Sequence, residues 1–264
     1  MRYLNYIFLF VFWLLSSCAE SEQEEQSNEL NQNDLGELAD FIEPNPKLDS
    51  IAKSWPQEDV IYGFLLDEYE VLFKEQNSDD CGGLELMMPP KEEDYIEQDE
   101  LVFRASGDLH FILESGDTLI LENESFDEQK QNFSSSGFYT FAGSVERSNY
   151  WEVFVIGYEC HYTVLVNKLN GNTLKVIGRP LVSPDGQLVI CGNPDIESGY
   201  TINGFDILEQ RNGTLFPIGQ LELSDWGPFK SSWKNDSVAI IEKGVLDENF
   251  DVQRSCVEMI FSKY

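Results

Sequence analysis

Residues 101–264 are dominated by short runs in which apolar and polar side chains alternate. The runs are rich in Val, Ile, Tyr and Phe, the residue types that favour strands. Dipeptides typical of tight turns separate them, namely Ser115-Gly116, Asn170-Gly171, Asn203-Gly204 and Asn212-Gly213. Because no amphipathic helical period lies between the runs, the pattern predicts an antiparallel, all-β domain.

Residues 46–100 show a different period. Within them Ile61, Leu65, Tyr69 and Leu72 recur near one face of a helix. A proline-containing stretch that begins at Cys81 then favours a loop. We therefore expect a partly helical N-terminal segment in front of the β domain.

The first 17 residues have the pattern of a secretory signal peptide. Arg2 precedes nine consecutive apolar residues that end at Leu15. Crossing a bilayer as a helix takes about 20 such residues, so the run is too short to span a membrane. We exclude residues 1–17 from the fold on this ground.

The sequence Leu15-Ser16-Ser17-Cys18 closes this run and resembles the lipobox of bacterial lipoproteins. In that family a signal peptidase cuts before the cysteine, whose thiol carries a diacylglycerol. The resemblance implies that Cys18 is the lipid attachment residue and that the lipid anchors the protein in a membrane. Ala19 resembles the sorting residue of outer-membrane lipoproteins. The acids that follow resemble a surface-export signal, and a spacer on the periplasmic face is the equal alternative.

Acidic residues dominate the composition, with 48 Asp and Glu against 17 Lys and Arg and a formal net charge of −31. Residues 18–45 are acidic and poor in large apolar side chains, so we interpret them as a flexible tether. A field of this sign repels phosphate backbones, which excludes nucleic acid as a partner.

The five cysteines agree with a lipid-modified Cys18, because four then remain to pair in an oxidising compartment. These disulfide candidates are Cys81, Cys160, Cys191 and Cys256. Four cysteines allow three pairings, and the sequence does not choose among them. We favour Cys160 with Cys191, since both end predicted strands in one region, which leaves Cys81 with Cys256.

One turn carries a second resemblance. The block that ends Ser183-Pro184-Asp185-Gly186 before a short apolar run resembles the WD40-like repeat of TolB-type β-propellers. A fainter copy lies 50 residues later, at 233–240. The resemblance implies propeller-like blades, closed into a ring or incomplete, with a β-sandwich as the runner-up. The whole chain also resembles uncharacterised bacterial lipoproteins, which brings no activity with it.

Candidate ligand-binding residues are few. The chain contains no Gly-x-Ser-x-Gly, Walker or His-Glu-x-x-His motif, so no catalytic residue is nominated. Two acidic loops offer oxygen ligands for calcium, at Asp195 with Glu197 and at Asp247 with Asp251, against the alternative of solvated turns. Trp226 lies in a predicted loop, where an exposed ring is the candidate contact for a ligand, against the favoured alternative that the rings of this region fill the core.

Three functions fit these observations. The favoured one is a lipid-anchored binding or scaffold protein of the cell envelope that presents loops to a protein or glycan partner. It predicts an exposed apolar patch bordered by acids. The second is an envelope glycan hydrolase with paired carboxylates. The third is an acidic inhibitor or immunity lipoprotein that neutralises a basic enzyme.

Overall fold

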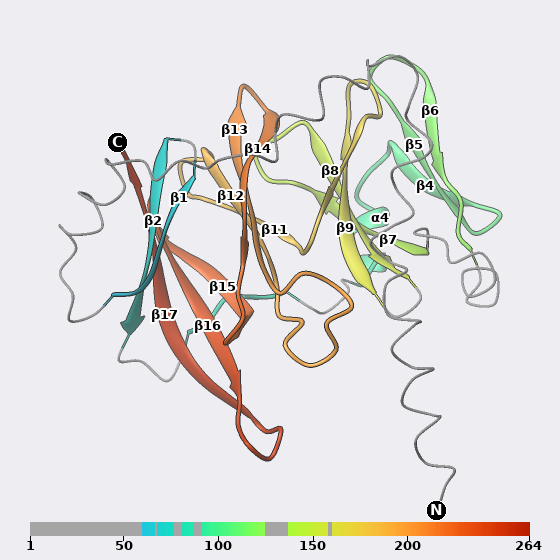
Figure 1. The fold of residues 1–264 in the computed structure, drawn as a ribbon. Helices are drawn as coiled ribbons and strands as arrows, with labels where there is room; N and C mark the ends of the chain where they lie inside the picture. The colour runs from blue at the N-terminus through green and yellow to red at the C-terminus, as the bar shows by residue number, and fades with distance from the viewer. Residues whose placement is uncertain (1–59, 67, 77–80, 87–90, 125–136, 158–159) are drawn as a thin grey trace, which may run out of the picture.

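The structure is a computed structural model that describes residues 60–66, 68–76, 81–86, 91–124, 137–157 and 160–264 (Figure 1). The predicted signal peptide, Cys18 and the tether lie outside these residues. The described part is mainly β, and its strands form four antiparallel sheets. This confirms the all-β prediction for the second part of the chain.

Sheets 1 to 3 each take their strands from one continuous stretch of sequence, and we number them in the order of those stretches. Sheet 1 consists of β4 (Val102–Ala105), β5 (Asp108–Ile112) and β6 (Thr118–Leu121). Sheet 2 consists of β7 (Phe138–Ser144), β8 (Tyr150–Ile156), β9 (His161–Asn167) and β10 (Thr173–Val176). Sheet 3 consists of β11 (Pro180–Val182), β12 (Leu188–Asn193), β13 (Gly204–Arg211) and β14 (Thr214–Glu222).

Sheet 4 combines strands from both ends of the described chain. Its strand order is β1 (Val60–Leu66), β2 (Tyr69–Gln76), β17 (Val252–Lys263), β16 (Val238–Leu246), β15 (Gly227–Asn235) and β3 (Leu84–Glu85). β2 pairs with β17 in a register that sets Phe73 opposite Met259 and Val71 opposite Phe261. The sheet therefore joins segments that are remote in sequence.

The prediction of a helical period at residues 60–76 is wrong. These residues form the β1 and β2 hairpin, and the helix among the described residues, α4 (Glu93–Ile96), is only four residues long. Tyr69, Val71 and Phe73 alternate with half-buried residues along β2, and all three are buried. The strand period of two therefore prevails over the helical spacing, because pairing with β17 buries this face.

The predicted hairpin turns are confirmed where residues with special backbone conformations connect paired strands. Asn212 and Gly213, between β13 and β14, both have positive φ, at 54° and 78°. Asn and Gly adopt this region at little cost, as a two-residue hairpin turn with this twist requires. Ser115-Gly116 and Asn170-Gly171 likewise join β5 to β6 and β9 to β10.

Three apolar clusters pack the sheets in the order 1, 2, 3, 4 (Figure 1). Phe111 of sheet 1 packs with Phe141 and Trp151 of sheet 2 in the first cluster. The second cluster joins sheets 2 and 3, and the third joins sheets 3 and 4. Sheets 2 and 3 are thus covered on both faces, which explains why β8 and β12 are buried almost throughout.

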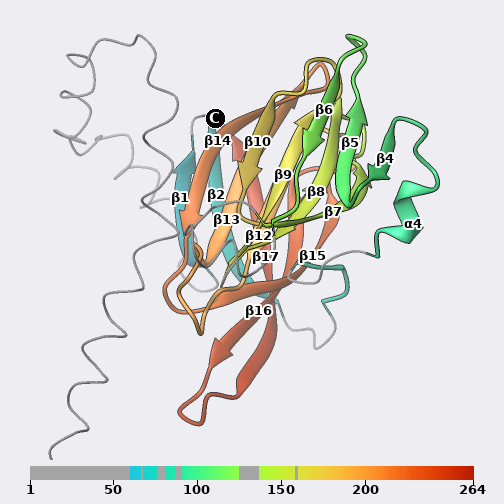
Figure 2. The same cartoon turned by 90° about the vertical axis from the view of Figure 1, so that its right-hand side faces the viewer.

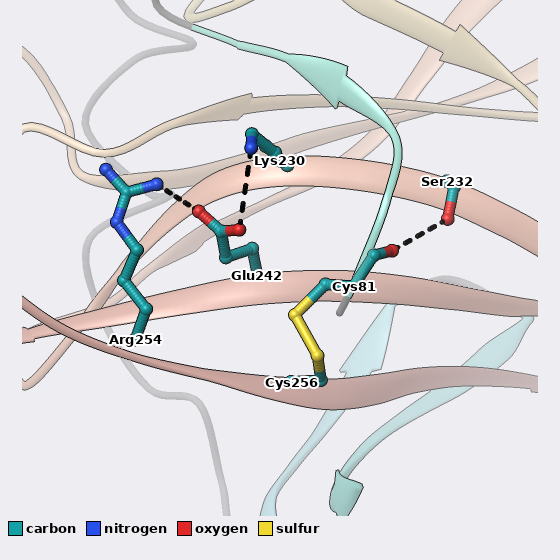
Figure 3. Close-up of a disulfide and its surroundings, with 6 residues drawn as sticks. All are labelled: Cys81, Lys230, Ser232, Glu242, Arg254 and Cys256. Carbon is teal, nitrogen blue, oxygen red and sulfur yellow. Dashed lines mark hydrogen bonds and ion pairs between the residues drawn. A yellow bond between two sulfur atoms is a disulfide. The ribbon is translucent and has the colours of Figure 1, made fainter. Parts of the chain in front are cut away.

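A disulfide fixes the chain to sheet 4 just before it leaves for sheet 1. Cys81 is bonded to Cys256 of β17, 175 residues away in sequence (Figure 3). Beside the bond, the Ser232 hydroxyl donates to the carbonyl of Cys81 at 3.4 Å. The predicted pairing of Cys81 with Cys256 is therefore confirmed.

The other expected pairing is wrong, because neither Cys160 nor Cys191 forms a disulfide. Cys191 lies on β12, fully buried in the cluster between sheets 2 and 3. Cys160 lies just before β9 and lines a pocket. Cys160 directly precedes β9, whereas Cys191 lies inside β12 and not at its end, and the two strands belong to different sheets.

The segment from Cys81 to Leu101, apart from residues 87–90, touches all four sheets as it runs from sheet 4 to sheet 1. Leu86 is buried against Gly192 and Phe205 of sheet 3. Asp99 accepts a hydrogen bond from the indole nitrogen of Trp151 in sheet 2 at 2.8 Å. This crossing segment therefore connects the two ends of the array of sheets.

Candidate functional site

A pocket of about 580 Å³ opens between sheets 2 and 3. Its wall on sheet 2 comes from the start of β9 and the end of β10, and its wall on sheet 3 from β13, β14 and the loop between β12 and β13. The lining residues with polar side chains are Cys160, His161, Tyr162, Lys175, Tyr200, Thr201, Asp206, Gln220 and Glu222. The volume falls within the range of roughly 300–1,000 Å³ that is typical of small-molecule sites.

Asp206 is the half-buried carboxylate of this pocket. One oxygen, Oδ2, accepts from the backbone N–H of Ile177 at 2.8 Å, and Oδ1 accepts from the Gln220 side chain at 2.7 Å. Burial raises the pKa of Asp206, although these two hydrogen bonds oppose the shift. A carboxylate oxygen has two acceptor positions, so each oxygen retains one for a further donor.

His161 stands at the mouth of both this pocket and a smaller neighbouring cavity of about 200 Å³. Its ring stacks on Phe154 at 5.7 Å. Burial lowers its pKa, and nearby Asn193 and Asp195 only partly offset this. Because the ordinary value is already below 7, His161 is neutral at neutral pH.

Two tyrosine rings add flat apolar surface to the pocket. Tyr162 is buried and receives the Lys175 ammonium over its face, 4.2 Å from the ring centre. Tyr200 remains 38% exposed on the loop between β12 and β13. A neutral imidazole, two rings and a hydrogen-bonded carboxylate can together bind a ligand that offers hydroxyl groups and an apolar face.

The calcium candidate Asp195 holds the loop of this pocket in shape. Its Oδ1 accepts from the backbone N–H groups of Ser198 and Gly199, and its Oδ2 accepts from the backbone and hydroxyl of Thr201. Its partner candidate Glu197 is exposed and lines the smaller cavity with Asp195. Asp195 thus positions Tyr200 and Thr201 through an ordinary turn.

The second calcium pair lies in the turn between β16 and β17, at the tip of a hairpin that projects beyond the other sheets (Figure 2). Asp247 accepts from the backbone N–H groups of Asn249 and Asp251, which lower its pKa. Among the residues that the structure describes, no three Asp, Glu, His or Cys side chains gather closely enough to hold a metal ion. Asp247 and Asp251 lie in a turn that these backbone hydrogen bonds hold together.

Trp226 lies in the core, as the favoured alternative has it, and not at the surface as a ligand contact. Only 2% of its surface is accessible, and its ring packs edge-on against Phe73 at 5.5 Å. Phe205 also packs against it at 6.5 Å. Trp226 directly precedes β15 as predicted, but strands from both ends of the chain close over it, so it belongs to the core between sheets 3 and 4.

The residues that form the pocket had little local signal in the sequence. Asp206, Gln220 and Glu222 alternate with buried residues on their strands and look like solvent-facing positions. The pairing of β13 with β14 brings them together, and the packing of sheet 2 against sheet 3 closes a pocket over them. The register that sets Asp206 opposite Gln220 could have been inferred from the Asn212-Gly213 turn, but the facing sheet could not.

Comparisons with known proteins add little. The chain matches no protein family model and no curated protein. Among solved structures it is similar to one described as a 6-phosphogluconolactonase from Bacteroides uniformis, with 10% identity over 73% of this chain and 85% of that chain. The TM-score is 0.24, so this likeness supports no conclusion about fold or function. Within the described residues, no helix has the length and apolar character to cross a membrane.

Proposed function

We propose that this protein is a lipid-anchored binding protein of the bacterial cell envelope whose pocket between sheets 2 and 3 binds a saccharide. The observation that carries the proposal is the set of groups around Asp206: an acceptor carboxylate fixed by two hydrogen bonds, beside aromatic rings. Saccharides present hydroxyl donors and apolar C–H faces, which suit these two kinds of group. The polar groups are already held in place, so little ordering accompanies binding.

We further propose that the four sheets are propeller-like blades that do not close a ring. Sheets 1 to 3 are each an antiparallel meander of consecutive strands, and β15 to β17 form another within sheet 4, to which β1, β2 and β3 add from the N-terminal part. The Ser183 to Gly186 turn lies between the first two strands of sheet 3, and the corresponding turn, 50 residues on, lies between β15 and β16 of sheet 4. Equivalent positions of this kind support a blade repeat.

Calorimetric titration with defined oligosaccharides of N-acetylglucosamine, mannose and galactose tests the pocket. We expect one of these series to bind, and Tyr200→Ala to weaken that binding by about tenfold or more. Phe216→Ala is a matched control, since Phe216 is 41% exposed on β14 and does not line the pocket. Absence of binding by every series, or equal loss in both variants, would contradict the proposal.

A second function, hydrolysis of envelope glycans, is favoured by one observation. Asp206 and Glu222 line the same pocket on adjacent strands, and Glu222 is two residues from the position opposite Asp206. Side chains in that diagonal relation lie on one face of the sheet, with Cα atoms about 7–8 Å apart. The raised pKa of Asp206 also suits a general acid.

Release of reducing ends from the same oligosaccharides separates the two functions. Turnover that Glu222→Gln abolishes, while saccharide binding persists, would favour the hydrolase. Binding without turnover supports the binding protein. Asp206 already accepts two hydrogen bonds, from Ile177 and Gln220, and this favours binding without turnover.

The location at the outer membrane has its own test. Cys18→Ser is expected to abolish incorporation of labelled lipid and to release the protein from the membrane fraction. Protease treatment of intact cells then distinguishes the surface face from the periplasmic face. A Cys18→Ser protein that remains in the membrane fraction would sink the lipoprotein proposal.

A further inference from the structure

The outer face of sheet 1, at the end of the array, carries an ordered set of apolar side chains. Leu109 and Phe111 of β5 point inward to sheet 2, so the alternate residues on the three strands point away from it. The strand register sets Phe103, His110 and Ile120 in one row across the sheet. Ile112 and Leu101 lie in the next row, joined by a backbone hydrogen bond of 2.8 Å.

These side chains are accessible to an unusual degree for their size. Leu101 is 40% exposed, Phe103 42%, Ile112 36% and Ile120 46%. The His110 ring stacks on Phe103 at 5.0 Å and fills the centre of the row. The four residues, with His110, form a continuous patch that we call the sheet 1 face. Contiguous patches of this kind mark sites of interaction more often than single exposed apolar residues do.

The border of the sheet 1 face is acidic. Residues 92–124, which contain sheet 1, hold eleven acids and a single Lys or Arg, Arg104. Arg104 is already paired with Glu92 at 2.7 Å. Asp108 lies two residues before His110 on β5, and Glu122 lies two residues after Ile120, at the end of β6. In the strand register both acids therefore fall in the row next to Phe103, His110 and Ile120, on the same face of the sheet.

The charge of this border discriminates among possible occupants. A second copy would bring acids against acids, and a membrane with anionic headgroups would be repelled in the same way. A protein surface with an apolar centre and a border of Lys and Arg complements both parts of the face. We propose that the sheet 1 face docks such a protein, independently of the pocket between sheets 2 and 3.

A pair of short peptides provides the probe. One has alternating Leu and Thr flanked by lysines at each end, and the other has glutamates in place of the lysines. Fluorescence anisotropy with the full mature chain is expected to show binding of the lysine peptide alone. Raising the salt concentration from 0.05 to 0.5 M should weaken that binding, because exposed charges are screened.

Substitutions locate the binding. Phe103→Asp and Ile120→Asp are each expected to weaken the lysine peptide by about tenfold or more. Phe216→Asp is the matched control, because Phe216 is equally exposed but lies on β14 of sheet 3. Since all three side chains are exposed, each variant should keep the circular dichroism and melting temperature of the parent protein.

Four outcomes would overturn the proposal. They are equal binding of both peptides, no binding of the lysine peptide, unchanged binding by Phe103→Asp, and equal loss in Phe216→Asp. Two further measurements address the other occupants with the Cys18→Ser chain. A dimer in sedimentation that Phe103→Asp dissociates would assign the face to a second copy. Binding to phosphatidylglycerol and phosphatidylethanolamine vesicles that Phe103→Asp abolishes would assign it to a membrane.

Discussion

Sheets 1 and 4 lie at opposite ends of the same array (Figure 1). Their outer faces differ in charge and in the apolar surface that they expose. Residues 227–263 of sheet 4 hold six acids and five bases, whereas residues 92–124 around sheet 1 hold eleven acids and one base. In sheet 4, Glu242 pairs with Lys230 and Arg254 (Figure 3). Lys234 pairs with Glu258. Cys81 also covers part of this sheet through its disulfide.

The contrast shows two ways in which the outward side chains of an end sheet can be accommodated: by groups of the same chain, or by another protein. Sheet 4 obtains neutralising charges and a covalent cover from its own chain. Sheet 1 presents apolar side chains instead, with acids at the border. A charged end is soluble by itself, while an apolar end of this kind suits a complex.

The largest expected effect is a difference in stability between substitutions on the inner and the outer face of sheet 1. Phe111→Ala removes a fully buried ring between sheets 1 and 2 and should lower the free energy of unfolding by about 3–5 kcal/mol. Phe103→Ala, on the opposite face, should change it by no more than about 0.5 kcal/mol. Urea denaturation followed by tryptophan fluorescence measures both. A comparable loss in the two variants would mean that the outer face is also part of the core.

The disulfide of sheet 4 comes next. Cys81→Ser is expected to lower the free energy of unfolding by about 2–5 kcal/mol, because the bond closes a long loop. Cys256→Ser should have the same effect, and the double variant should be no worse than either single one. Cys160→Ser serves as the control, since Cys160 forms no disulfide. Sensitivity of the Cys81→Ser protein to reducing agent would argue against this pairing.

A smaller difference in the free energy of unfolding is expected when one acid is neutralised at each end of the array. Glu242→Gln leaves Lys230 and Arg254 without their shared carboxylate and should cost about 1–2 kcal/mol, reduced by the exposure of both cations. Glu122→Gln on sheet 1 removes one acid from a strongly acidic region, so a change within about 0.5 kcal/mol in either direction is expected. Melting at low and high salt checks both values. Equal losses would remove the distinction between the ends.

The smallest effect concerns the interior of the array. Burial lowers the pKa of His161 below its unfolded value of about 6.5, so the unfolded chain binds the proton more readily. The contribution of His161 to stability is therefore complete above pH 6.5 and is lost as the pH falls through the folded pKa. His161→Gln should lose less stability than the parent protein between pH 7 and pH 5. Denaturation curves at several pH values test this, and parallel pH profiles would contradict it.

The parts of the fold that depend on neighbouring residues were predictable from the sequence. Turns such as Asn212-Gly213 determine their hairpins locally, and the alternating runs predict the strands of sheets 1 to 3. The β2 strand was missed because its residues fit a helical spacing as well as a strand. The choice depends on β17, which lies about as far from β2 as the chain permits.

The candidate site was predictable only in part. Asp195 and Glu197 were recognised as an acidic loop, and this loop does form a wall of the smaller cavity. Asp206 and Gln220 were not recognised, since nothing near them in sequence indicates that sheet 2 lies opposite. The packing partners of Trp226 were not predictable either, because Phe73 and Phe205 reach it from remote segments.

The pairing of β2 with β17 also constrains the order of events in the life of the chain. Synthesis delivers β2 first, yet its sheet partner β17 follows only after some 180 further residues. Until then the edge of β2 that carries Val71 and Phe73 lacks its hydrogen-bonding partner strand, so sheet 4 cannot be completed as the chain emerges. Sheets 1 to 3 have no such delay and can assemble one after another. The nascent protein should therefore stay open at this end, available to chaperones, until β17 has been synthesised.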